Sequence, residues 1–159
     1  MRIQVITVGK LKEKFLRLAC DEYLKRLSSY AKVEILEIAE EKATDTPSLG
    51  EIKWILQKEG ERIQKAIRSD TYLISLAIEG KSLSSPAFAK KLNELATYGQ
   101  SHLTFLIGGS YGLDPSLSKQ SDLLLSFSAM TFPHQLIRVF LLEQIYRSFK
   151  INRGETYHK

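Results

Sequence analysis

The chain has 159 residues, with 23 Lys or Arg against 18 Asp or Glu, which gives a formal net charge of +5. Hydrophobic residues make up 43% and charged residues 26%, a composition that excludes a disordered, collagen-like or coiled-coil chain and is typical of a globular domain. The only cysteine, Cys20, excludes an internal disulfide and a thiolate zinc cluster, so we expect a reducing, cytoplasmic environment.

The first part of the chain predicts a strand, a helix, a strand and a second helix. Alternating apolar residues predict a buried strand over Arg2–Val8, which Gly9 ends. Apolar residues then recur every three or four positions over 13–29, which predicts a helix with one apolar face. A second strand is predicted at 33–38. After a linker at 40–50, Thr46-Pro47 predicts the start of a long helix that extends to Ile67.

The middle of the chain predicts a strand, a helix and another strand. Residues 71–78 are nearly all apolar or β-forming, which is typical of a strand covered on both faces, and we expect this strand to stop at Glu79-Gly80-Lys81. Ser85-Pro86 predicts the start of a helix, and Gly99 predicts the cap beyond its end. Residues 103–107 predict a fourth strand.

The last part predicts a short helix, a fifth strand at 122–127 and a final helix from Pro133 to about Lys150. The alternation of strands and helices predicts an α/β fold with a mostly parallel sheet flanked by helices, in one domain over residues 1–159. No signal peptide or membrane span is expected, because the N-terminus has the pattern of a strand and Arg138 interrupts the most apolar stretch.

Three successive strands end in loops that can approach a ligand: 76–80, the glycine-rich 107–112, and 126–134. In open parallel sheets ligands bind beyond the carboxyl ends of the strands, so three such exits together favour a pocket. The glycine run is not a Walker loop, because no Lys-Ser or Lys-Thr follows it, and Ile107 stands where a dinucleotide fingerprint needs its first glycine. The mixed apolar and hydroxyl-bearing residues of 126–132 suit an adenine edge or a thioether chain.

Other reactive residues have simpler interpretations. Ser128 and His134 are too close along one loop for a hydrolase triad, and no GxSxG motif is present. We expect His134 to cap or pack at a helix start and Cys20 to lie in the core. The final helix is apolar on more than one side. Either a partner subunit or deep packing within one chain could cover the additional apolar surface.

The positive charge lies at the two ends of the chain. Residues 1–32 carry eight basic and three acidic residues, 33–70 six and nine, 71–137 four and four, and 138–159 five and two. Pairs such as Asp21 with Lys25 and Glu143 with Arg147 have the order that stabilises a helix. Two basic clusters suit phosphate contacts better; they are Lys10, Lys12 and Lys14, and Arg147, Lys150, Arg153 and Lys159.

Three segments carry a resemblance to a known family. FLIGGSYGL at 105–113, SFSAMTFPHQLIRVFLLEQIYRSF at 126–149 and the ending Tyr157-His158-Lys159 together resemble the ribosomal large-subunit methyltransferase H family of the SPOUT superfamily, over the full length of the chain. The resemblance implies a SPOUT-type fold with a deep C-terminal trefoil knot, which general folding rules would have disfavoured. It also implies a homodimer, S-adenosyl-L-methionine as methyl donor, no metal, and N3-methylation of a pseudouridine in 23S rRNA within the assembled ribosome.

The resemblance also assigns site residues. Cofactor contacts fall on Leu76, on Gly108 and on Phe127, Ser128, Ala129, Met130, Thr131 and Phe132. The catalytic set falls on Arg147, Tyr157, His158 and Lys159. Relatives often end in Arg where this chain has Lys159, which keeps the charge but loses the planar fork of donors.

A hypothesis for the chemistry follows from these assignments. His158 is the candidate acceptor of the N3 proton, because the unperturbed pKa of histidine is about 6.5. Tyr157 would stack on or hydrogen-bond the base, and Arg147 and Lys159 would neutralise phosphate or the developing anion. Two alternatives stay open: a non-catalytic ribosome- or RNA-binding factor, and a SPOUT methyltransferase acting on tRNA.

Overall fold

A computed structural model describes all residues from Met1 to Lys159. Five strands form one sheet in the order β2-β1-β4-β3-β5, and every neighbouring pair is parallel. The strands are β1 (Arg2–Val8), β2 (Lys32–Ile38), β3 (Tyr72–Ser82), β4 (His102–Ile107) and β5 (Leu123–Ser126). The predicted α/β fold with a parallel sheet flanked by helices is therefore confirmed, and β1 has the predicted bounds.

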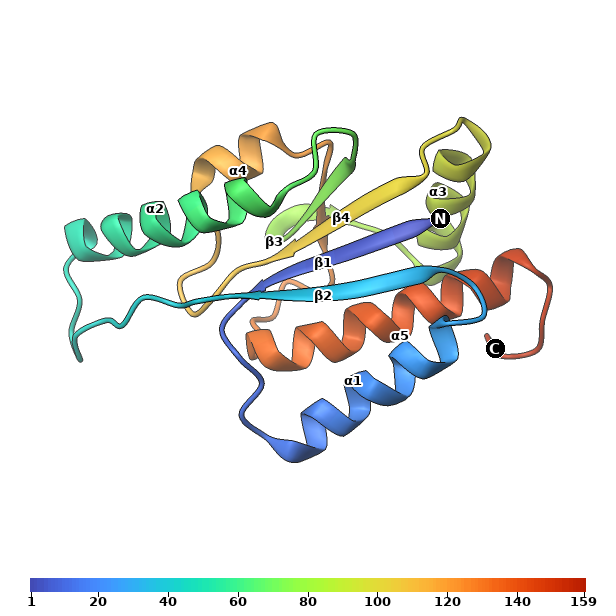
Figure 1. Cartoon of the computed structure of the whole chain (residues 1–159), viewed down its shortest axis with the longest axis horizontal. Coiled ribbons are helices and arrows are strands. Elements are labelled where there is room, and N and C mark those ends of the chain that lie inside the picture. Colours follow the sequence, from blue (N-terminus) through green and yellow to red (C-terminus); the bar gives the residue numbers. More distant parts are fainter.

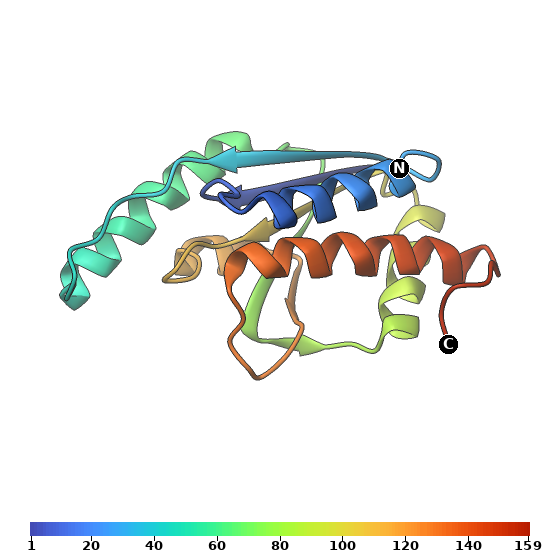
Figure 2. The same cartoon turned by 90° about the horizontal axis from the view of Figure 1, so that it is seen from below.

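The helices cover both faces of the sheet. They are α1 (Lys14–Leu27), α2 (Leu49–Ala66), α3 (Ser85–Thr97), α4 (Pro115–Gln120) and α5 (His134–Asn152). The larger core joins one sheet face to α1, α3 and α5, and Figure 2 shows α1 and α5 running side by side beneath the sheet. The smaller core joins the other face to α2 and α4. Cys20 is buried in the larger core, as expected from its place on the apolar face of α1.

The start of α2 differs from the prediction. Ser48, rather than Thr46, is the N-cap, and its hydroxyl accepts a hydrogen bond from the Glu51 N–H at 3.1 Å. The hydroxyl of a cap must reach the free N–H groups of the first turn, and Ser48 has the backbone conformation that allows this. Thr46 and Pro47 therefore precede the helix, which ends at Ala66 with Ile67 as its C-cap.

β3 also differs, because it continues to Ser82 instead of stopping at residues 79–81. Leu76 and Lys81 both lie opposite Leu125 of β5, so the chain makes an irregular excursion between them and then pairs with β5 again. A Cβ on Gly80 would lie 2.7 Å from the Leu124 carbonyl carbon. Gly80 therefore permits close approach of two backbones rather than ending the strand.

Most of the apolar surface of α5 is covered within the chain. Leu141, Leu142 and Ile145 are fully buried between the sheet, α1 and α3. Phe140, on another side of the helix, stays 40% exposed. Packing within one chain thus accounts for most of the width of this apolar surface. No helix is long and apolar enough to cross a membrane.

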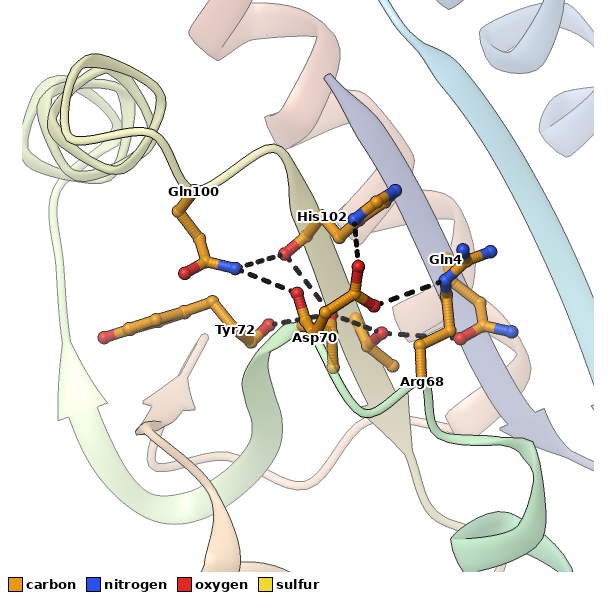
Figure 3. A network of polar contacts seen from close by, with 8 residues as sticks. Gln4, Arg68, Asp70, Tyr72, Gln100 and His102 are labelled. Carbon is orange, nitrogen blue, oxygen red and sulfur yellow. Dashed lines mark hydrogen bonds and ion pairs between the residues drawn. The ribbon is translucent and has the colours of Figure 1, made fainter.

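A polar network closes the amino end of the sheet (Figure 3). His102 Nδ1 lies 3.1 Å from Asp70 Oδ2, and the Gln100 side chain donates to the carbonyl oxygens of Asp70 and His102, each at 3.2 Å. These contacts join the start of β3 to the start of β4, at the edge of the sheet opposite the carboxyl ends of the strands.

Candidate functional site

A cavity of about 790 Å³ lies at the carboxyl ends of β3, β4 and β5. Its size is within the range of small-molecule sites in proteins. The three loops that the sequence singled out all contribute to its wall. Of the predicted cofactor residues, those that line the cavity are Leu76, Gly108, Phe127, Ser128, Met130, Thr131 and Phe132. Ala129 belongs to the same loop but is not part of the lining.

The loop after β4 is a tight turn closed by its own backbone. The Gly112 N–H donates to the Gly109 carbonyl at 3.1 Å. A Cβ on Gly108 would lie 2.4 Å from the Gly112 carbonyl carbon, a distance that no packing adjustment of side chains relieves. Gly108 is therefore required for the turn that shapes this wall of the cavity.

The loop after β5 is held by two serine hydroxyls. Ser126 Oγ donates to the Ser128 carbonyl at 3.1 Å, and Ser128 Oγ accepts from the Met130 N–H at 2.9 Å. These local bonds fix the turn without a neighbouring element. Met130 remains 73% exposed, so its side chain is free to cover a ligand.

The charge of the cavity restricts its ligand. No Lys or Arg is among the lining residues, and Glu79 is the only carboxylate there. Burial lowers the pKa of His134, the one histidine in the wall, which favours its neutral form. Such a wall suits a neutral or cationic ligand and provides no side-chain cation for a polyphosphate.

The predicted catalytic residues gather at the other end of α5. Glu143 Oε1 accepts from Arg147 Nη2 at 2.6 Å, from Arg147 Nε at 2.9 Å and from the Tyr157 hydroxyl at 3.1 Å. The Arg147 guanidinium lies over the Tyr157 ring, 4.8 Å from its centroid. Burial and the hydrogen bond to Glu143 raise the pKa of Tyr157 to about 12, so its phenol is protonated and acts as a donor.

His158 makes a contact that limits its proposed role. Its Nδ1 lies 3.1 Å from Arg147 Nη1, and because a guanidinium only donates, Nδ1 must be the acceptor. The remaining proton of the neutral ring is then on Nε2. In this arrangement His158 has no free lone pair, and it can accept a proton only after the contact with Arg147 breaks. Lys159 is exposed and pairs with no acidic group.

A second cavity of about 650 Å³ lies between the loop after β5 and the predicted catalytic residues at the end of α5. Arg147, Tyr157 and Glu143 line it, together with Phe127 and Phe132 from the loop after β5. Phe127 and Phe132 also line the first cavity, so these two rings lie between that cavity and the tail residues. The structure therefore brings Arg147, Tyr157 and His158 together next to the predicted cofactor loop.

Glu143 binds two of the predicted site residues, Arg147 and Tyr157, and the sequence did not single it out. Its position four residues before Arg147 was interpreted as ordinary helix pairing, and that ion pair is indeed present. What the spacing does not reveal is that the same oxygen also binds Tyr157, which lies 14 residues further along the chain. No group of three or more His, Cys, Asp or Glu side chains is placed to hold a metal ion.

Comparison with known proteins agrees with the resemblance. A family model described as "Predicted SPOUT methyltransferase" matches residues 1–158. Two proteins named "Ribosomal RNA large subunit methyltransferase H", from Bifidobacterium adolescentis and Bacillus cytotoxicus, are 58% and 57% identical to the chain over 159 residues, which covers all of each protein. The protein of that name from Bacillus thuringiensis subsp. konkukian is 57% identical over the same length. Because the match includes every strand end around the cavity and reaches the tail, the chain belongs to the SPOUT methyltransferase family.

Proposed function

We propose that this chain is a large-subunit rRNA methyltransferase that uses S-adenosyl-L-methionine to methylate N3 of the pseudouridine at position 1915 of 23S rRNA in the assembled ribosome. Family membership and the full-length relatives support the reaction class. The observation that carries the choice of donor is the cavity at three strand ends, whose wall has no Lys or Arg. A sulfonium cation is compatible with that wall, whereas a nucleoside triphosphate is not.

The residues around the cavity fit such a donor. The hydroxyls and backbone groups of 108–112 and 126–131 offer hydrogen bonds for an adenine edge and a ribose. Leu76, Phe127 and Phe132 offer apolar contact for the base and the thioether chain. Glu79 is placed to attract the positively charged end of the ligand. We propose that these residues, with Ala129 as part of the same loop, hold the donor.

When bound, S-adenosyl-L-methionine supplies an electrophilic methyl group on its sulfonium sulfur. The contribution of the chain is positioning, since holding two reactants in line accounts for a large share of the acceleration of a transfer. Phe127 and Phe132 face both cavities, so a base in the second cavity would meet the donor between these two rings.

We propose that the tail residues act on the base. The Tyr157 ring is placed to stack on the base, and its hydroxyl, which donates to Glu143 in this structure, can donate to the base only after that bond breaks. Arg147 is placed to stabilise the negative charge that develops on an imide. His158 takes the N3 proton once substrate has drawn Arg147 away from its Nδ1. Lys159 contacts a phosphate near the modified base.

We also propose a homodimer and a trefoil knot. Support for the dimer is Phe140, which is 40% exposed beside the open second cavity, where a second copy would bury it. Support for the knot is limited to the irregular pairing of β3 with β5 and the close approach of Gly80 to Leu124. Family membership favours both.

Two measurements test the function. Calorimetric titration with S-adenosyl-L-methionine should show one site per chain, and absence of binding by folded protein at millimolar ligand would favour the alternative of a non-catalytic ribosome-binding factor. Transfer of a tritiated methyl group should then be compared on free rRNA, isolated subunits, whole ribosomes and tRNA. We expect labelling of whole ribosomes, and labelling of tRNA alone would replace rRNA with tRNA as substrate.

A further inference from the structure

The loop between β1 and α1 and the first turns of α1 form an exposed basic surface. It consists of Lys10, Lys12, Lys14, Phe15, Arg17 and Leu18, which we call the α1 basic surface. All six side chains are exposed, and the two apolar ones, Phe15 and Leu18, are 65% and 57% accessible. An exposed phenylalanine among four cations is not explained by the hydrophobic core.

The four cations of this surface have no acidic partners. None of them forms an ion pair, although Arg26 near the end of the same helix pairs with Glu22 at 3.0 Å. Glu13 is the only acidic residue between positions 9 and 20, so the segment has four basic residues against one acidic residue. Unpaired cations on one face are the electrostatic signature of a surface that binds a polyanion.

The same surface is fixed next to the cofactor cavity. Arg138 Nη2 donates to the Gly9 carbonyl at 3.2 Å, and the Leu11 N–H donates to Glu37 Oε2 at 3.2 Å. Arg138 lies one turn after His134, which lines the cavity. Figures 1 and 2 show the loop after β1 passing the amino end of α5. A ligand on the α1 basic surface is therefore held at the edge of the site where the methyl donor binds.

We propose that the α1 basic surface binds the RNA substrate, with Lys10, Lys12, Lys14 and Arg17 on backbone phosphates and Phe15 stacked on an unpaired base. This rests on the proposed function, and it assigns RNA recognition to a surface separate from the tail residues. Aromatic rings interleaved with cations are how proteins hold single-stranded RNA, because every base has a face that stacks. A second copy of the chain is a poorer occupant, since a two-fold contact centred here would place lysines against lysines.

The test is binding to whole ribosomes without methyl donor, measured by co-sedimentation at several salt concentrations. The variant Lys10→Gln/Lys12→Gln/Lys14→Gln should bind about tenfold more weakly at physiological salt. The plot of log affinity against log salt should also become less steep, by about two to three in slope, since each phosphate contact contributes roughly 0.7–0.9. Phe15→Ala should weaken binding about fivefold or more, and Phe15→Tyr should restore it, because tyrosine still stacks.

The matched control is Lys53→Gln/Lys65→Gln/Lys119→Gln, which removes the same charge from exposed, unpaired lysines on the opposite face of the sheet. Equal loss of ribosome binding in both triple variants would overturn the proposal. It would also be overturned if Phe15→Ala/Leu18→Ala changed the oligomeric state of the free protein and left ribosome binding unchanged. Calorimetric affinity for S-adenosyl-L-methionine should be unchanged in every variant. If the wild-type chain does not bind S-adenosyl-L-methionine in the titration, the proposed function is contradicted. The co-sedimentation needs no methyl donor, so it still tests whether the α1 basic surface binds RNA.

Discussion

Arg138 and Glu37 form an ion pair that joins the start of α5 to the end of β2, with 2.8 Å between Arg138 Nη1 and Glu37 Oε2. The Arg138 side chain is 3% exposed and the Glu37 side chain 35%. The same carboxylate oxygen accepts from the Leu11 N–H, and Arg138 Nε has no partner. One ion pair thus orients both the loop that begins the α1 basic surface and the helix that follows the loop after β5.

Removing either partner should have unequal effects on stability. Glu37→Ala leaves a buried guanidinium without its counter-charge, and we expect it to lower the free energy of unfolding by about 2–4 kcal/mol. Arg138→Met removes the buried charge and the unpaired Nε and leaves a carboxylate that water can reach, so its cost should be smaller, about 1–2 kcal/mol. Urea denaturation measures both values.

The exposed pair formed by Arg26 and Glu22 provides the control for this comparison. Glu22→Ala should change the free energy of unfolding by less than about 1 kcal/mol, because exposed pairs contribute little. If Glu37→Ala is no more costly than Glu22→Ala, the ion pair formed by Arg138 and Glu37 does not stabilise the fold.

Glu59 should make stability depend on pH in the direction opposite to most carboxylates. It is 5% exposed in α2, and burial raises its pKa above the ordinary value of 4.5. The folded state therefore holds this proton more tightly than the unfolded state, so stability is greatest below pH 4.5 and falls as the pH rises through the raised pKa. Glu59→Gln should thus be more stable than wild type at pH 7, and the difference should disappear in acid.

Glu51 provides the matched comparison with the opposite sign. Hydrogen bonds from the Thr44 N–H and hydroxyl lower its pKa, so its contribution is present above pH 4.5 and is lost as the pH falls through the lowered pKa. Glu51→Gln should therefore be less stable than wild type at neutral pH. Thermal unfolding of the two variants between about pH 2 and pH 8 covers the range on both sides of 4.5 in which the two contributions change. Curves of the same sign would contradict the role given to burial at Glu59.

The elements that the sequence predicted best are those whose own side chains decide their structure. β1 has apolar β-formers at Ile3, Val5, Ile6 and Val8, and all four are buried, so the local pattern alone shows where the strand begins and ends. β3 was predicted to stop too early, because its extension to Ser82 depends on pairing with β5, more than 40 positions away. The start of α2 was misplaced because Ser48 and Thr46 are both acceptable caps, and the chosen one depends on where the chain leaves the linker.

In the candidate site, too, the features set by local sequence were predictable and those set by distant contacts were not. The cavity was predictable because ligands bind where parallel strands end, and three loops after successive strands share that edge. The contact between Arg147 and His158 was not predictable, since it requires the tail to return to the last turns of α5. Glu143 was missed for the same reason: its pairing with Arg147 is local, whereas its bond to Tyr157 is not.

Gly108→Ala should disturb the proposed cofactor cavity directly. The new Cβ would meet the backbone of Gly112 at 2.4 Å, and because backbone atoms cannot move aside, the turn after β4 must open. We expect a loss of about 1–3 kcal/mol in stability and at least about a tenfold loss of affinity for S-adenosyl-L-methionine. Gly50→Ala in α2, where a Cβ meets nothing closer than 3.9 Å, is the matched control and should bind the donor normally. Unchanged donor affinity in Gly108→Ala would place the donor elsewhere.

Glu143→Gln should change the titration of Tyr157. In the wild type, burial and the hydrogen bond to the Glu143 carboxylate raise the phenol pKa from 10.0 to about 12. Removing the negative charge leaves burial as the main cause, so the pKa should fall but stay above 10.0. Ultraviolet absorbance follows phenolate formation, and Tyr157→Phe identifies the signal by abolishing it. Glu22→Gln, which alters a similar pair on α1, should leave the titration unchanged. A Tyr157 pKa that is the same in Glu143→Gln and wild type would show that the carboxylate does not hold the tail against α5.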